Sequence, residues 1–101
     1  MATVQEMAMF AVVGLFGTNA IPHFVRGITG EEHMTPFGSE SSAVVNVLWG
    51  SVNAAVAGVL AWVYRDAVDA STLAVAFVAG VALAVGLASY WSTENPTLPW
   101  E

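Results

Sequence analysis

The hydrophobic positions of this chain fall into three long runs, at about residues 7–25, 43–64 and 73–91. Each run has about 20 residues, the length that an α-helix needs to cross the hydrocarbon core of a bilayer. All eight carboxylates lie outside these runs, as the high cost of a charge in lipid requires. The pattern predicts an all-α fold, a polytopic integral membrane protein built as a bundle of three transmembrane helices.

The polar segments between the runs predict how the helices are joined. Residues 26–42 form a long polar connection, in which the tetrapeptide Thr-Pro-Phe-Gly at 35–38 has the composition of a β-turn. The second connection is short, so we expect the second and third helices to be antiparallel neighbours. The tail at 92–101 is too short to form a domain. We therefore expect one transmembrane domain over residues 1–101.

Small polar residues mark the expected helix starts. Ser42, with Ser41 before it, is a candidate N-cap of the second helix, and Asp69 is a candidate N-cap of the third. Thr29 and Glu32 have the spacing of a capping box, which predicts one further helical turn inside the long connection.

Small residues in the later runs predict close helix packing. The third run has no polar side chain between residues 73 and 88, and its small residues recur every four positions. Such a stripe lets another helix approach closely. The expected packing residues are Gly50, Ala76, Gly80, Ala84 and Ala88.

Polar side chains gather on one face of each of the first two helices. Asn19, His23 and Arg26 are spaced i, i+4, i+7 on the first helix. The end of this helix and the start of the second lie on the same side of the membrane, so the two polar faces should meet beneath the long connection. The candidate ligand-binding or substrate-binding residues are Asn19, Pro22, His23, Arg26, Asn46, Trp49 and Asn53.

Each of these residues also has a purely structural interpretation. A transmembrane asparagine commonly joins two helices through a hydrogen bond. Arg26 can reach the lipid headgroups, and Pro22 can simply bend the helix. However, ionisable residues inside a membrane are functional candidates by default, so the sequence leaves both interpretations open.

Composition supports a membrane location and excludes several functions. Hydrophobic residues make up 56% of the chain and charged residues only 10%, against about 25% in a typical soluble domain. With two arginines, no lysine and a net charge of −6, the chain has no basic patch for nucleic acid. The absence of cysteine excludes disulfides. We expect a multi-pass protein of the cell membrane, with membrane lipids as partners.

The sequence contains no recognisable catalytic or metal-binding motif. His23 and His33 are the only histidines, and either could in principle hold a haem or a metal ion, although no zinc-type spacing is present. No G-x-S-x-G pattern indicates a nucleophilic serine. We assign no catalytic residue or metal ligand and do not expect an enzyme.

The polar residues also form an extended pattern, N-x-x-P-H-F-x-x-G-x-T-G from Asn19, then T-P-F-G from Thr35 and S-S-x-x-x-N-V-L-W-G from Ser41. This pattern resembles a family of small, uncharacterised bacterial integral membrane proteins, over about the first half of the chain. The resemblance implies a short membrane protein and supplies no activity.

Three functions are compatible with these features. The first is an oligomeric membrane module, either a homo-oligomer or a subunit of a larger complex. The second is a minimal oligomeric transporter or channel that uses the polar cluster around His23 and Arg26. The third is a membrane protein that binds a lipid, a quinone or a haem.

Overall fold

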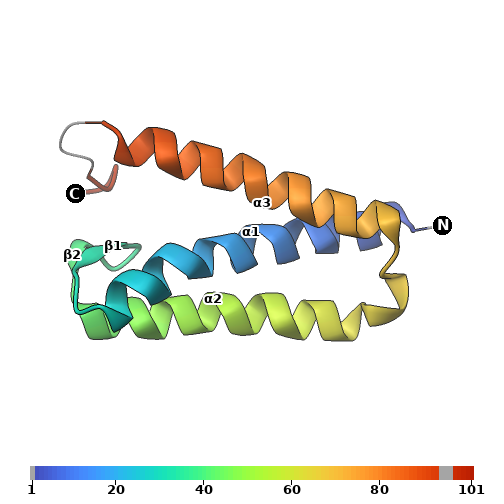
Figure 1. Cartoon of the computed structure of the whole chain (residues 1–101), viewed down its shortest axis with the longest axis horizontal. Coiled ribbons are helices and arrows are strands. Elements are labelled where there is room, and N and C mark those ends of the chain that lie inside the picture. The colour runs from blue at the N-terminus through green and yellow to red at the C-terminus, as the bar shows by residue number, and fades with distance from the viewer. Residues whose placement is uncertain (1, 94–96) are drawn as a thin grey trace.

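The computed structural model describes residues 2–93 and 97–101. Its three long helices are α1 (Val4–Ile28), α2 (Ala43–Val63) and α3 (Ala70–Trp91) (Figure 1). All three are long and apolar enough to cross a membrane. The expected all-α bundle of three membrane helices is therefore confirmed, although α1 extends beyond the predicted run at both ends and α3 begins three residues earlier than predicted.

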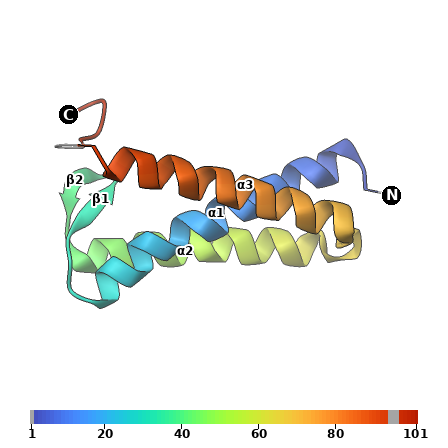
Figure 2. The ribbon, with the colours of Figure 1, turned by 45° about the horizontal axis from the view of Figure 1, so that its top comes forward.

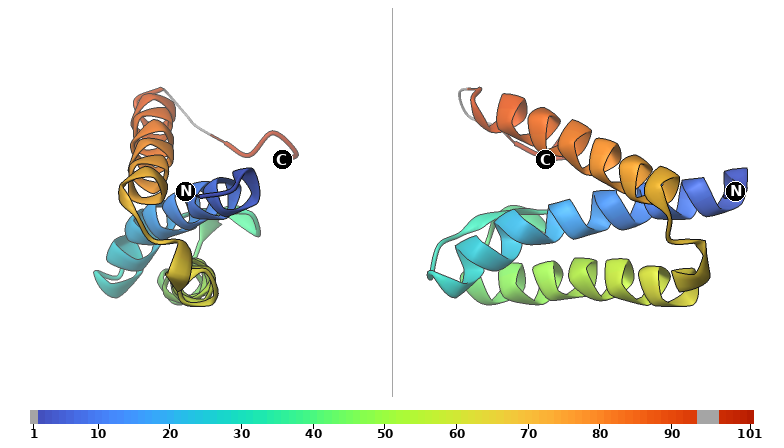
Figure 3. Two further views of the ribbon diagram at one scale, coloured as in Figure 1. Left: turned by 90° about the vertical axis from the view of Figure 1, so that its right-hand side faces the viewer. Right: turned by 45° about the vertical axis from the view of Figure 1, so that its right-hand side comes forward.

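Helix α1 lies between the other two helices and packs against both (Figures 1 and 3). Helices α2 and α3 are antiparallel, but they pack mainly on α1 rather than on each other. The expectation that α2 and α3 are packed neighbours was therefore wrong. The link between them contains a short 3-10 helix, η1 (Arg65–Ala67), which gives α3 room to cross to the far side of α1.

The long connection is an ordered β-hairpin rather than an irregular loop. Strand β1 (His33–Thr35) pairs antiparallel with β2 (Gly38–Ser41), and Thr35 lies opposite Gly38. Residues 36 and 37 therefore form the turn, as the tetrapeptide predicted. The expected extra helical turn at Thr29 is absent from this described segment, because Thr29 instead ends α1 and its hydroxyl donates to the carbonyl of Val25.

The predicted helix starts agree with the structure. The hydroxyl of Ser42 accepts a hydrogen bond from the Val45 amide at the start of α2. The carboxylate of Asp69 accepts from the amides of Ser71 and Thr72 at the start of α3. Such contacts satisfy amides that have no partner within the helix.

Glycines bring the helix backbones into contact. A Cβ atom on Gly14 would lie 2.1 Å from the carbonyl oxygen of Ala76, and one on Gly80 would lie 2.6 Å from the Thr18 hydroxyl. On the other side of α1, a Cβ atom on Gly50 would meet the Phe24 backbone at 2.7 Å. The first half of the small-residue stripe on α3 therefore packs on α1 of the same chain.

The second half of that stripe has no such contact. Ala84 and Ala88 are exposed, because α3 diverges from α1 toward its C-terminal end (Figure 1). This divergence opens a wedge at the end of the bundle that carries the hairpin. The C-terminal segment lies at the same end (Figure 2), where the Leu98 amide donates to the Ser39 hydroxyl.

Candidate functional site

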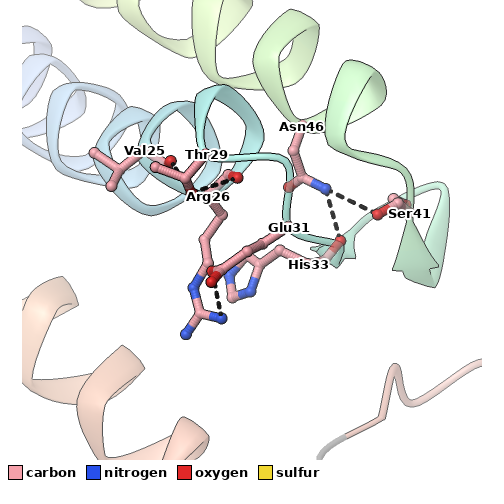
Figure 4. Close-up of polar contacts among 7 residues, drawn as sticks. All are labelled: Val25, Arg26, Thr29, Glu31, His33, Ser41 and Asn46. Atoms are coloured by element: carbon pink, nitrogen blue, oxygen red, sulfur yellow. Dashed lines mark hydrogen bonds and ion pairs between the residues drawn. The ribbon is translucent and has the colours of Figure 1, made fainter.

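The side chain of Asn46 on α2 contacts the hairpin (Figure 4) and also helix α1. Asn46 lies in the first turn of α2 and is fully buried. Its Nδ2 group donates to the carbonyl oxygens of His33 at 2.9 Å and Ser41 at 3.1 Å. It also lies 3.0 Å from the carbonyl oxygen of Ser42, which accepts from the same group. Its Oδ1 atom lies 2.9 Å from Nδ1 of His23 on α1. One amide therefore fixes both strands of the hairpin and the end of α1.

These contacts also determine the hydrogen-bonding state of the His23 ring. Three carbonyl acceptors around Nδ2 of Asn46 identify the other amide atom as the oxygen. Oδ1 can only accept, so Nδ1 of His23 carries the donated proton. In the neutral ring the Nε2 atom then keeps a free lone pair.

A second polar contact joins α1 and α2 one level deeper. Nδ2 of Asn19 donates to Oδ1 of Asn53 at 3.2 Å, and Nδ2 of Asn53 donates to the Trp49 carbonyl at 2.8 Å. Asn53 is only 2% exposed. These bonds satisfy both polar ends of the buried Asn53 amide and connect the two helices, as is typical of membrane bundles.

Above these contacts the diverging helices form a partly open cavity of about 190 Å³, which we call the hairpin chamber. It is bounded by all three helices, the hairpin and the C-terminal segment. Its lining residues are Asn19, Pro22, His23, His33, Met34, Thr35, Pro36, Trp49, Leu87, Tyr90, Trp91 and Leu98.

Aromatic rings form much of the chamber wall. The ring centroids of His23 and His33 are 5.3 Å apart, and those of His33 and Trp91 are 4.4 Å apart. Phe37 packs edge-on against Trp49 at 5.5 Å and supports it from the hairpin side. In the part of the chain that the structure describes, the buried side-chain nitrogens and oxygens without a hydrogen-bond partner are Nε1 of Trp49 and Nε1 of Trp91.

Among the residues that the structure describes, none that lines the chamber is a carboxylate, a lysine or an arginine. His33 lies in the hairpin and is 9% exposed. Burial is the largest of the effects that together lower the pKa of His33 to about 4, and the nearby His23 and Arg26 side chains act in the same direction. The His33 ring is therefore uncharged at neutral pH.

Six of the seven candidate residues fall into two groups at the chamber. Asn19, Pro22, His23 and Trp49 line the chamber, whereas Asn46 and Asn53 act behind them through hydrogen bonds.

Arg26 lies outside the chamber. It forms an ion pair with Glu31 at 3.3 Å, and both side chains are more than half exposed (Figure 4).

The sequence interpretation missed the contribution of α3 and the tail. Leu87, Tyr90 and Trp91 share one face of α3 and line the chamber, and Leu98 completes the wall from the C-terminal segment. Neither Tyr90 nor Trp91 is among the candidate residues that the sequence predicts. Their i+3 and i+4 spacing from Leu87 was the available signal that they share a face.

The geometry does not suit a haem. The rings of His23 and His33 are in contact and tilted by 60°, so no macrocycle fits between them. A cavity of about 150 Å³ accommodates a single benzene molecule, and the chamber at about 190 Å³ is only slightly larger. Within residues 2–93 and 97–101, no three His, Asp or Glu side chains are grouped as a metal site would require.

Comparison of the chain with protein-family models, with curated proteins and with solved structures finds no match. The resemblance to small bacterial membrane proteins therefore stays a prediction.

Proposed function

We propose that this multi-pass membrane protein resides in the cell membrane and binds a small, uncharged, lipid-soluble molecule in the hairpin chamber. The observation that supports this proposal is the chamber itself, a cavity of about 190 Å³ between the diverging ends of α1 and α3. Well-packed proteins contain few voids larger than a water molecule. A cavity of this size in a three-helix chain is therefore a natural binding site.

The lining selects the class of ligand. Most of the wall is aromatic or aliphatic, from residues such as Pro22, Trp49, Leu87 and Trp91. None of the described lining residues is acidic or permanently basic, so a charged substrate would lose its hydration without gaining a partner among them. Molecules dissolved in the bilayer meet these requirements, because they are apolar and already concentrated around the helices.

The proposal can be tested by filling the chamber. Leu87 lines it, whereas Val85 on the same helix is 63% exposed and faces away. We expect organic extraction of the purified protein to release a small molecule, identified by mass spectrometry. The Leu87→Trp variant should lose this molecule, and the matched Val85→Trp variant should retain it. Equal retention by both variants, or no bound molecule in the parent, would contradict the proposal.

A second proposal is that the chain acts as an oligomeric module. It is supported by an apolar groove of about 490 Å³ between α1 and α2, on the outside of the bundle. Small residues, including Gly17, Gly50 and Ala54, form its floor, and a helix of a second copy could approach them closely. Native mass spectrometry in detergent should detect a dimer that Ala54→Trp disrupts and Ala55→Trp preserves. A strictly monomeric parent protein would exclude this proposal.

A further inference from the structure

Two buried imidazole rings on the wall of the hairpin chamber have nitrogen atoms that no described residue satisfies. His23 on α1 is 6% exposed and His33 on β1 is 9% exposed, and both rings line the cavity. Nδ1 of His23 is bonded to Asn46, whereas within residues 2–93 and 97–101 Nε2 of His23 and both ring nitrogens of His33 have no hydrogen-bond partner.

These histidine nitrogens are within reach of a ligand. The polar atoms that protein covers completely without giving them a partner are Nε1 of Trp49 and Nε1 of Trp91 in the described part of the chain. The histidine nitrogens do not belong to this group, so part of their surface stays accessible, and their rings border the cavity. The two histidines can therefore bond a molecule in the chamber, whereas the two tryptophans cannot.

The hydrogen-bonding state of the two rings indicates which chemical group fits them. Nε2 of His23 can only accept in the uncharged ring, because Nδ1 carries the proton that is donated to Asn46. The uncharged His33 ring, with its centroid 5.3 Å away, has one nitrogen that donates and one that accepts. A hydroxyl group both donates and accepts, whereas a carbonyl only accepts and would leave Nε2 of His23 without a partner.

The other polar groups on the chamber wall do not change this preference. The hydroxyls of Thr35 and Ser41 bond each other at 2.6 Å, and the Tyr90 hydroxyl donates to a carbonyl of the C-terminal segment. Nδ2 of Asn19 donates to Asn53. The remaining Oδ1 atom of Asn19 is an acceptor, so it also favours a ligand that donates.

The size of the chamber limits the ligand to about one ring. A protein cavity of about 150 Å³ binds benzene, so about 190 Å³ accommodates one six-membered ring with small substituents. Much of the wall is aromatic, with His33 and Trp91 in contact at a centroid distance of 4.4 Å. Aromatic side chains pack favourably on a flat aromatic ring.

We propose that the hairpin chamber binds an uncharged one-ring phenol, whose hydroxyl group donates a hydrogen bond to Nε2 of His23. This inference rests on the proposed function and narrows it from any small lipid-soluble molecule to one with a hydroxyl donor on its ring. It concerns binding and assigns no reaction.

Two probes of nearly the same shape test the role of the hydroxyl. In p-cresol one methyl group of p-xylene is replaced by a hydroxyl. The protein is labelled with ¹⁵N at histidine, which marks only His23 and His33, and is studied by NMR in detergent micelles. The measurement is made at about pH 8, where an ordinary histidine is uncharged. The p-cresol probe should shift the signal of the unprotonated Nε2 atom of His23, and p-xylene should shift it much less.

A variant of His23 separates hydrogen bonding from general packing. His23→Phe keeps a ring but removes the acceptor, so it should weaken p-cresol binding by about three- to tenfold. Its affinity for p-xylene should stay unchanged, which also shows that the chamber remains folded. Each probe is compared with itself in the two proteins, so its partition into micelles cancels. Tyr64→Phe removes a polar atom at the other end of α2, serves as the control and should alter neither affinity.

The outcomes distinguish failure of this inference from failure of the proposed function. If both probes bind but p-cresol leaves the Nε2 signal of His23 in place, the chamber takes small apolar rings and the hydroxyl requirement is wrong. If neither probe binds, both proposals fail. A third probe, 4-methylanisole, carries the same oxygen without its proton. If His23→Phe weakens the binding of 4-methylanisole as much as that of p-cresol, His23 acts through packing and the proposed hydrogen bond is overturned.

Discussion

Oδ1 of Asn46 accepts a hydrogen bond of 2.9 Å from Nδ1 of His23, and this contact joins the first turn of α2 to the last third of α1. The same Asn46 amide holds the backbone of both hairpin strands. The position of the hairpin over the chamber therefore depends on one buried side chain. Because Asn46 accepts a hydrogen bond from one ring nitrogen of His23, it also orients that ring on the chamber wall.

Replacing Asn46 should be more damaging than replacing Asn53. Asn46→Leu removes four hydrogen bonds and leaves buried carbonyls and His23 without partners, so we expect a loss of about 2–4 kcal/mol in the free energy of unfolding. Asn53→Leu breaks fewer contacts and should cost about 1 kcal/mol. Thermal unfolding of both variants in the same detergent measures the difference. If both variants lost the same free energy of unfolding, the contacts of Asn46 with the hairpin would contribute nothing to stability.

The sequence was sufficient to place Asn46 near His23, because helix periodicity determines which side chains share a face. It was not sufficient to show that Asn46 also holds both strands of the hairpin. Its other partners are backbone carbonyls of the hairpin, and backbone atoms leave no residue-specific signal in a sequence. The same limit applies to the chamber, because its α3 wall consists of ordinary apolar and aromatic residues such as Leu87.

The packing of α1 on α3 should depend on Gly14. A Cβ atom there would clash with the backbone of Ala76, which cannot move aside as a flexible side chain could. Gly14→Ala should therefore reduce the free energy of unfolding by about 1–3 kcal/mol. Gly86 on α3 has open space around it, so Gly86→Ala should be neutral or stabilise by up to about 1 kcal/mol. Unfolding of the two variants in micelles tests this, and a destabilised Gly86→Ala protein would contradict it.

These close contacts also explain why the arrangement of helices was only partly predictable. Hydrophobic runs establish the number and the approximate length of the helices. The short link between α2 and α3 suggested that they pack together, yet the contacts at Gly14 and Gly50 place α1 between them. Which small residues meet depends on matching two helix surfaces, and single-sequence periodicity does not reveal that match.

Arg26 should contribute little to either stability or binding. Its ion pair with Glu31 is more than half exposed, and such surface pairs are worth about 0–1 kcal/mol. We expect Arg26→Gln to change the free energy of unfolding by less than about 0.5 kcal/mol. It should also leave the retention of a small molecule in the chamber unchanged, since Arg26 does not line the chamber. A transporter that recognises an anion through Arg26 would instead lose its flux in proteoliposomes.

The hairpin should make the protein less stable in mild acid through His33. The folded structure lowers the pKa of His33 from 6.5 to about 4, chiefly by burial. Between these two pH values the unfolded chain binds a proton at this residue that the folded chain does not, so acid favours unfolding. The contribution of His33 is complete above about pH 6.5 and is lost progressively as the pH falls to about 4.

The variant His33→Gln isolates this effect from the carboxylates that also titrate near pH 4. Glutamine cannot be protonated in this range, so the variant should lose less stability than the parent between pH 7 and pH 4.5. Melting temperatures of both proteins across this interval give the comparison. Parallel pH profiles would show that His33 is as easily protonated in the folded hairpin as in the unfolded chain. The uncharged character that we assign to this wall of the chamber would then be wrong.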